Sequence, residues 1–391
     1  MKVFKLVLFN VIGLLLLLVL LELFCQLSGA HFFKPESYNS VMASRFQKQE
    51  MNQKELSDEF GQSSFKMPPA SLKLAENSSL EGYSYGDIDQ SPEKNRQWSW
   101  SKDGFIRSSR FIKKIKGTSK EVYNVLYRLN PLDKRVVENQ DSKTQTTSFV
   151  LAAGDSYTFG EGVDQGQDYP SQLASLLSAD RFVYNYGISG DSANDFAYRA
   201  TLDSQFFFPI KEQKGVFIWL YNDAQMQRLV YPTTAYSLTY INAKAEYTLD
   251  DGELVFHGFF NNSNRFKRKI INGLAGLALT KSFNLELPKV YTKDHYELFI
   301  KLLNLPLAIM EQTGKQFEKK ILVLYTSHYN TADLKQAAES NGFEVLYFEK
   351  LLYKRDKTFG GNMNLSLPVD GHPSPDAYWL LAQVLKEKYF N

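Results

Sequence analysis

From Thr146 to the C-terminus, hydrophobic and polar positions follow the order of strands and helices in alternation. Short apolar runs that suit buried strands alternate with longer segments of helical spacing, which is typical of a parallel sheet covered on both faces. The sequence therefore predicts an α/β domain with a parallel sheet of about five strands covered by helices on both faces. The expected strands are 148–154, 182–190, 215–223, 321–327 and 343–349, and the expected helices are 167–178, 191–207, 295–315 and 374–390.

An interruption at about 224–294 separates the third expected strand from the next helix. It contains alternating runs on either side of Asp250-Asp251-Gly252, which predicts a β-hairpin. Ligands of open parallel sheets bind outside the carboxyl ends of the strands. An insertion that leaves the sheet at a strand end is therefore expected to overhang the ligand crevice as a substrate lid.

The residues ahead of this domain predict two further segments. Positions 34 to about 95 are polar and rich in Ser, Gln, Asn and Glu, and are interpreted as a stalk. From Trp98 to Val137, aromatic and β-branched residues with a turn signal at Asn130-Pro131 predict a few strands. The expected organisation is thus a stalk and small β-containing segment over 34–145, followed by the α/β domain over 146–391.

The first 33 residues predict a membrane anchor. Lys2 and Lys5 precede an apolar run from Leu6 to Cys25, and roughly 20 residues of helix span about 30 Å, enough to cross a bilayer core. Because the positive charges lie on the N-terminal side, we expect a single-pass helix with the remaining chain on the exported side. The alternative is a removed signal peptide, with Ser28-Gly29-Ala30 as its cleavage site.

Charge and cysteine content exclude several classes of function. Lysine and arginine number 45 against 43 acidic residues, a formal net charge of +2, without the basic excess of a nucleic-acid binder. The single cysteine, Cys25, allows no intramolecular disulfide and no cysteine-based metal cluster. The densest basic stretch, Arg107 to Lys120, is interpreted as a solvated face, the alternative being contact with acidic polysaccharide or lipid headgroups.

No motif for a cofactor stands out. Gly160-Glu161-Gly162 is too short, and in the wrong context, for a dinucleotide fingerprint, and the chain contains no Walker-type phosphate loop. Glu161 is interpreted as an ordinary loop residue. We therefore expect neither a metal nor an organic cofactor.

Four short blocks lie at the ends of predicted elements. Gly154-Asp155-Ser156 follows the first strand, 185–190 ends the second, Tyr221-Asn222-Asp223 ends the third, and Asp370-Gly371-His372-Pro373 precedes the last helix. Taken together and in this order, they resemble the blocks of the SGNH/GDSL hydrolase family, over about 147–391. The resemblance implies the SGNH hydrolase fold, an α/β fold with a three-layer, flavodoxin-like parallel sheet.

The resemblance also implies roles for individual residues. Ser156 would be the nucleophile, His372 the base and Asp370 the acid. The oxyanion hole would consist of the backbone N–H groups of Ser156 and Gly190 and the side-chain amide of Asn222.

Two positions depart from the family pattern. Tyr221 stands where the third block usually has glycine. Many members place the acid three residues before the histidine, where this chain has Val369, whereas Asp370 lies two before. The Asp-x-His spacing is also found in family branches that modify cell-envelope polysaccharides.

The chemistry of ester cleavage accounts for these residue types. A hydroxyl that attacks an ester carbonyl needs a base for its proton and donors for the oxyanion that forms. Imidazole is the side chain whose pKa lies nearest neutrality, so His372 suits the base, with His328 as the other candidate. Asp370 would orient the imidazole; in the alternative, a backbone carbonyl does so and Asp370 is auxiliary.

The function expected from these observations is a membrane-anchored, exported serine esterase or deacetylase. It would act on O-acyl groups of a cell-envelope carbohydrate or lipid through an acyl-serine intermediate. A polysaccharide O-acetyltransferase with the same site is one alternative. The other is a non-catalytic polysaccharide-binding protein, for which Trp98 and Trp100 could stack on sugars.

Overall fold

The chain forms two compact units in the computed structural model. The larger comprises Gln62–Gln225 and Tyr296–Asn391, and the smaller Met1–Gly61 and Met226–His295. The structure describes residues 19–22, 88–89, 93–101, 104–138, 140, 143, 145–202, 206–207, 209–235, 241, 243–263, 265–325, 331–352 and 365–391, with the backbone alone for 93–101 and 104–105.

A five-stranded parallel sheet forms the centre of the larger unit, as predicted. Across the sheet the strands follow the order β5-β4-β6-β9-β10. Numbered along the chain, this is 2-1-3-4-5, the flavodoxin-like order. The strands are β4 (Ser148–Gly154), β5 (Arg181–Gly187), β6 (Lys214–Tyr221), β9 (Gln316–Leu324) and β10 (Phe343–Tyr347). The sequence located β9 only from 321, because its first five residues are exposed or half-buried and lack an apolar run.

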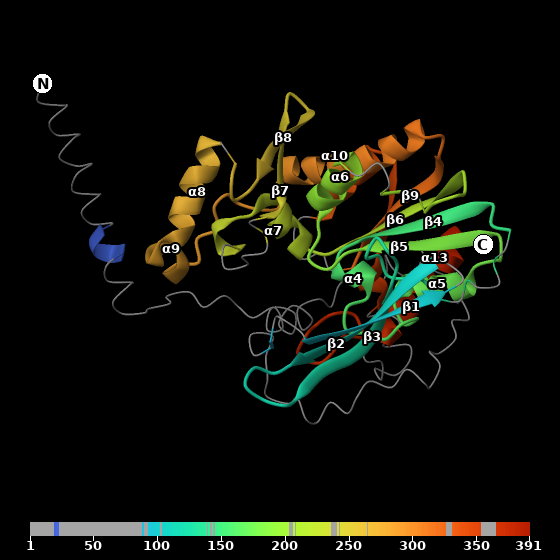
Figure 1. The fold of residues 1–391 in the computed structure, drawn as a ribbon. Helices are drawn as coiled ribbons and strands as arrows, with labels where there is room; N and C mark the ends of the chain where they lie inside the picture. Colours follow the sequence, from blue (N-terminus) through green and yellow to red (C-terminus); the bar gives the residue numbers. More distant parts are fainter. Residues whose placement is uncertain are drawn as a thin grey trace, which may run out of the picture. The chain divides into compact units, whose positions relative to one another are not determined.

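Helices cover both faces of this sheet (Figure 1). Those on one face are α6 (Ala193–Leu202) and α10 (Lys293–Gln312), and those on the other are α5 (Tyr169–Leu176) and α13 (Pro375–Tyr389), while α11 (Thr331–Glu339) connects β9 to β10. Ser374 caps α13 by accepting a hydrogen bond from the Ala377 N–H, at 3.2 Å, and Pro375 occupies the first turn. Both residue types are typical of a helix start and agree with the helix predicted over 374–390.

The carboxyl ends of β4 and of its two neighbours, β5 and β6, are level. Gly154, the last residue of β4, pairs with Gly187 of β5 and with Leu220 of β6. The chain runs from β4 to β5 on one side and then crosses to β6 on the other, and this reversal opens the ligand crevice of such folds. The first three sequence blocks therefore lie along one edge of the sheet.

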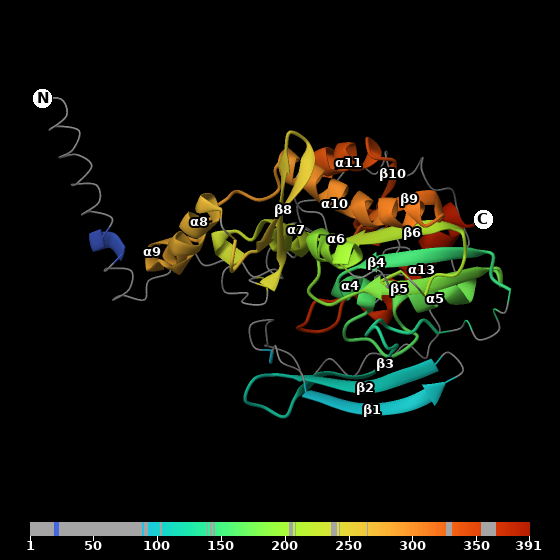
Figure 2. The ribbon, with the colours of Figure 1, turned by 45° about the horizontal axis from the view of Figure 1, so that its top comes forward.

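An antiparallel sheet of three strands belongs to the same unit. Its strands are β1 (Glu93–Ser101), β2 (Gly104–Lys114) and β3 (Glu121–Leu129), in the order β1-β2-β3. Figure 2 shows it below the parallel sheet, on the side of α4 (Ser156–Phe159) and α5. The predicted turn follows β3, where the Asn130 side chain accepts hydrogen bonds from the N–H groups of Leu132 and Lys134.

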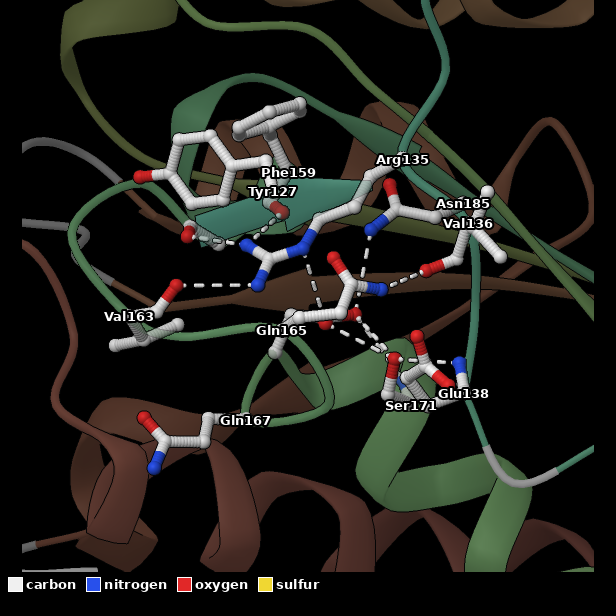
Figure 3. A network of polar contacts seen from close by, with 12 residues as sticks. Tyr127, Arg135, Val136, Glu138, Phe159, Val163, Gln165, Gln167, Ser171 and Asn185 are labelled. Atoms are coloured by element: carbon white, nitrogen blue, oxygen red, sulfur yellow. Dashed lines mark hydrogen bonds and ion pairs between the residues drawn. The ribbon is translucent and has the colours of Figure 1, made fainter. Parts of the chain in front are cut away.

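Arg135 fastens the segment after β3 to the parallel-sheet domain (Figure 3). Its buried guanidinium pairs with the carboxylate of Asp168 at 3.3 Å and lies 4.7 Å from the centre of the Tyr127 ring. The same guanidinium donates to four backbone carbonyls of the loop after α4, those of Phe159, Gly160, Val163 and Asp164, at 2.6–3.1 Å. One side chain thus shapes the whole loop.

The smaller unit contains the predicted hairpin. Strands β7 (Ala245–Asp250) and β8 (Glu253–Phe259) are joined through Asp251 and Gly252. Both turn residues have positive φ, 47° and 82°, as a type I′ turn requires. The helices α7 (Ala224–Val230), α8 (Phe266–Gly276) and α9 (Ala278–Ser282) complete the insertion.

The predicted anchor lies outside the described residues except for 19–22. Among the described residues, no helix is both long and apolar enough to cross a membrane. The anchor stays a prediction.

Replacing Arg135 by methionine should destabilise the larger unit strongly. The variant leaves the buried Asp168 carboxylate without its countercharge and four carbonyls without their donor, and such losses typically cost about 3–5 kcal/mol. Urea unfolding measures the change. Arg110→Met is the matched control, because this exposed arginine of β2 bonds only to Asn124 among the contacts described and should cost less than about 0.5 kcal/mol. Equal losses in the two variants would contradict the role of Arg135.

Candidate active site

Ser156 lies at a tight turn between β4 and α4. Asp155 caps this short helix by accepting the Tyr157 N–H at 3.0 Å, which makes Ser156 its first residue. A β-carbon at Gly154 would lie 2.4 Å from Thr158 Oγ1, and one at Gly187 would lie 2.2 Å from the backbone nitrogen of Phe159. Two glycines at strand ends thus let α4 close against the sheet and hold the serine at its edge.

Ser156, His372 and Asp370 form a continuous hydrogen-bonded chain. His372 Nε2 lies 2.8 Å from Ser156 Oγ, and its Nδ1 lies 2.6 Å from Asp370 Oδ2. A carboxylate can only accept, so Nδ1 carries a proton; in the neutral imidazole Nε2 is then unprotonated and accepts from the serine hydroxyl. The Asp370 side chain is fully buried. The structure therefore brings the three predicted residues into the arrangement of a nucleophile, a base and an orienting acid.

A strained turn orients Asp370, which lies two residues before the histidine in the sequence. Val369 has a φ of 63°, and the Asp370 N–H donates to the Pro368 carbonyl at 2.6 Å, which is the hydrogen bond of a γ-turn. This conformation is unusual for a β-branched residue and occurs where the surroundings enforce it. It directs the carboxylate of Asp370 to Nδ1, the position that the alternative interpretation assigned to a backbone carbonyl.

The three predicted oxyanion donors lie at the same edge of the sheet. Gly190, with φ 82°, is in a turn closed by the Asp191 N–H on the Ile188 carbonyl at 3.0 Å. Asn222, just after β6, donates from Nδ2 to Asp155 Oδ2 at 2.7 Å. An amide nitrogen carries two hydrogens, so one N–H remains besides the one that Asp155 accepts. The oxyanion role of these groups stays a prediction.

Two charged residues that the sequence analysis had set aside belong to this site. Lys113 Nζ lies 3.2 Å from Asp370 Oδ1 and 3.0 Å from Glu161 Oε1, and the Tyr123 hydroxyl donates to the same Glu161 oxygen at 3.1 Å. Lys113 is only 3% exposed. The interpretation of 107–120 as a solvated face was therefore wrong for Lys113, and Glu161 is more than a loop residue.

A signal for Lys113 exists in the sequence, although it is weak. Side chains of a strand alternate between its two faces, and on β2 Ser109 is buried while Arg110 is exposed. Lys113 and Ile115, both buried, continue the inward-facing set of Ser109. A lysine at an inward position of a strand is the pattern that could have indicated it.

The charges around His372 shift the pKa values of the site. Burial by itself would raise the pKa of Asp370, but the imidazole and the Lys113 ammonium lower it to about 2. Burial would lower the pKa of His372, yet Asp370 and Glu161 raise it above 6.5. The carboxylate is thus ionised, and the histidine is a stronger base than usual.

The other histidines take no part in this arrangement as far as the structure describes them. His257 bonds to Thr248, and His295 to Thr292, in the smaller unit. His328, the other candidate base, lies outside the described residues, as do His31 and the side chains of Trp98 and Trp100. Among the described residues, no group of three or more potential metal ligands could hold an ion.

Comparison with known proteins gives matches among solved structures. The chain matches no protein-family model and no curated protein sequence. A lipolytic G-D-S-L family protein from Veillonella parvula is 13% identical, with a TM-score of 0.34, covering 62% of this chain and 98% of its own. The acetylxylan esterase Axe2 from Geobacillus stearothermophilus is 16% identical, with a TM-score of 0.35, covering 64% and 97%.

A third match is TesA, at 16% identity and a TM-score of 0.30, covering 61% of this chain and 96% of its own. These structures include members of the family that the four sequence blocks resemble. Their TM-scores are low, so the assignment that follows depends on the blocks and on the geometry of the site.

The raised pKa of His372 can be tested without any substrate. Its imidazole should titrate above 6.5, and Asp370→Asn should lower that pKa because the neighbouring negative charge is removed. The measurement is an NMR titration of the imidazole C–H signals, assigned by their loss in His372→Gln. A wild-type value below 6.5 would show that the carboxylates do not govern this histidine.

Proposed function

We propose that this chain is a serine esterase or deacetylase of the SGNH/GDSL type that acts on O-acyl groups. One observation carries the proposal, the hydrogen-bonded chain from Ser156 Oγ through His372 to the Asp370 carboxylate. A turn serine, a loop histidine and a buried aspartate that served only for packing would not need this alignment. These hydrogen bonds support a catalytic function over the alternative of a non-catalytic binding protein.

The proposed reaction proceeds in two halves. In the first, His372 Nε2 accepts the proton of Ser156 as Oγ bonds to the ester carbonyl carbon, and Asp370 stabilises the imidazolium that results. The N–H groups of Ser156 and Gly190 and the amide of Asn222 would hold the oxyanion. Collapse breaks the bond to the alcohol oxygen, which takes the proton from His372 and leaves an acyl-serine.

In the second half, water attacks the acyl-serine while His372 again accepts a proton. Returning this proton to Ser156 Oγ frees the serine and releases the carboxylic acid. If a sugar hydroxyl replaces water, the same steps transfer the acyl group, and the protein is an O-acetyltransferase. The two functions use the same residues and differ only in the acceptor.

Ser156 should react with a fluorophosphonate probe and should turn over p-nitrophenyl acetate. Ser156→Ala should lose both activities, and Asp370→Asn should lower turnover by about 10⁴-fold because the imidazole loses the partner that fixes its tautomer. Mass spectrometry of the labelled peptide identifies the modified residue, and an added acetyl-accepting oligosaccharide tests for transfer. A folded wild-type protein that neither labels nor hydrolyses would overturn the proposal.

We propose further that the protein is anchored in a membrane and that its substrate is a carbohydrate or lipid of the cell envelope. The predicted anchor supports this, since a site carried on the exported side meets envelope molecules. Glu22, near the end of the apolar run, accepts hydrogen bonds from the N–H groups of Ala278 and Leu279 at 2.7 and 2.6 Å. The start of α9 thus contacts the end of the predicted anchor.

Helix α8 of the smaller unit has the pattern of a helix that lies on a membrane surface. Phe266, Ile270 and the C-cap residue Leu277 are 78%, 46% and 37% exposed and lie along one side at helical spacing. Lys267 and Lys269, both exposed, flank this stripe on either side. An apolar stripe between lysines suits the boundary between acyl chains and anionic headgroups.

A fluorophore at position 266 should therefore enter the bilayer. The experiment places full-length Phe266→Cys, in a Cys25→Ser background, in nanodiscs and labels it with nitrobenzoxadiazole. Emission should shift to the blue, and doxyl-labelled lipids should quench it, because the stripe lies among acyl chains. The same label on Glu253→Cys, an exposed polar position of the hairpin, is the control. Equal quenching at both positions, or none at 266, would contradict the membrane contact.

A further inference from the structure

Lys113 connects the N-terminal sheet to the acid of the proposed triad. It is the last residue but one of β2 and contacts Asp370, which is 257 positions away in the chain. The two oxygens of the Asp370 carboxylate are thereby divided between two partners, with Oδ2 on the imidazole and Oδ1 on the ammonium. A carboxylate held at both oxygens cannot rotate away from His372.

Glu161 holds Lys113 from the other side and extends the network towards the predicted oxyanion turn. Its carboxylate accepts from the Lys113 ammonium and from the Tyr123 hydroxyl. The side chain of Ser189, the residue before Gly190, also lowers the pKa of Glu161. Glu161 therefore interacts both with the ammonium that holds Asp370 and with a residue of the predicted oxyanion turn.

The charges of this cluster are arranged for the protonated state of the histidine. The charged groups that act on His372 are Asp370 from its own loop, Glu161 from the loop after α4 and Lys113 from β2. The Tyr157 ring of α4 also packs against the imidazole, with 5.3 Å between the ring centres. With a neutral imidazole, two carboxylates face one ammonium, and the cluster has a net negative charge. When His372 accepts the serine proton, the charges balance.

We propose that Lys113 and Glu161 are a pair of positioning residues, in which Lys113 locks the Asp370 carboxylate against His372 and the two opposite charges together set the basicity of the base. This inference rests on the proposed esterase function for its kinetic consequences. In this proposal the β1–β3 sheet contributes to the active site, because β2 supplies Lys113 and β3 supplies Tyr123, whose hydroxyl donates to Glu161.

The two charges act on His372 in opposite directions. The Lys113 ammonium lowers the pKa of His372, and the Glu161 carboxylate raises it. Removing the lysine charge should therefore raise the pKa of the base, and removing the glutamate charge should lower it. A merely structural role would not give shifts of opposite sign.

The experiment compares Lys113→Met, Glu161→Gln, the double variant and Lys113→Arg in the full-length protein. The pKa of His372 is measured by NMR, and kcat/KM for p-nitrophenyl acetate is measured from pH 5 to 9. In Lys113→Met, the pKa of the acidic limb of the kcat/KM profile should rise by about 0.5–1 unit. In Glu161→Gln it should fall by a similar amount. The double variant should return to within about 0.3 unit of wild type, because two opposite shifts of similar size cancel when they add.

Turnover separates positioning from binding. Lys113→Met should lower kcat by about 10- to 100-fold with little change in KM, since a freed carboxylate misplaces the base by a fraction of an ångström. Lys113→Arg, which keeps the charge, should recover most of this loss. Lys116→Met removes an exposed lysine just after β2 and should change neither limb nor kcat, which controls for net charge.

Each outcome decides between the inference and the function on which it rests. Shifts of the same sign, or no shift, in Lys113→Met and Glu161→Gln would overturn the inference while wild-type turnover left the esterase proposal standing. If wild type neither labels nor hydrolyses, the esterase proposal fails, and the NMR titration still tests the charge pair. If thermal unfolding shows Lys113→Met to be misfolded, Glu161→Gln and Lys113→Arg carry the test.

Discussion

The buried carboxylate of Asp370 is the constraint on which the site depends. A charge removed from water destabilises the folded state by several kcal/mol unless partners replace its hydration. Here the partners are His372, two residues away, and Lys113, which comes from the other end of the domain. The site therefore exists only when the N-terminal sheet and the C-terminal loop are folded together.

Arg135 acts by the same principle at the loop that follows the short helix of Ser156. A second buried ion pair, with Asp168, holds a guanidinium where it can bind the carbonyls of the loop after α4. Glu161 lies within that loop, between two of the carbonyls that Arg135 binds. The segment upstream of the parallel sheet thus supplies two buried cations. Lys113 pairs with Asp370, and Arg135 pairs with Asp168 and binds the loop after α4.

The N-terminal strands therefore contribute side chains to the proposed site and do not only separate it from the predicted anchor. Their inward faces carry Lys113, Tyr123 and Tyr127, all buried against the loops that follow α4. The chemistry that we propose requires a stable imidazolium in each transition state. A cluster whose charges balance only when His372 is protonated favours that state.

The sequence by itself predicted the elements of the parallel-sheet domain and the three residues of the proposed triad. Apolar runs predict buried strands, Asp250-Asp251-Gly252 a hairpin and Ser374 a helix cap, because these signals depend on neighbouring residues. The blocks at the strand ends marked Ser156, Gly190 and Asn222, since parallel strands bring their carboxyl ends to one edge. Only the tertiary structure showed the contacts of Lys113 with Glu161 and Asp370 and the γ-turn at Val369. A lysine paired across 257 positions resembles any solvated lysine locally, because its partners are brought to it only by the packing of two sheets.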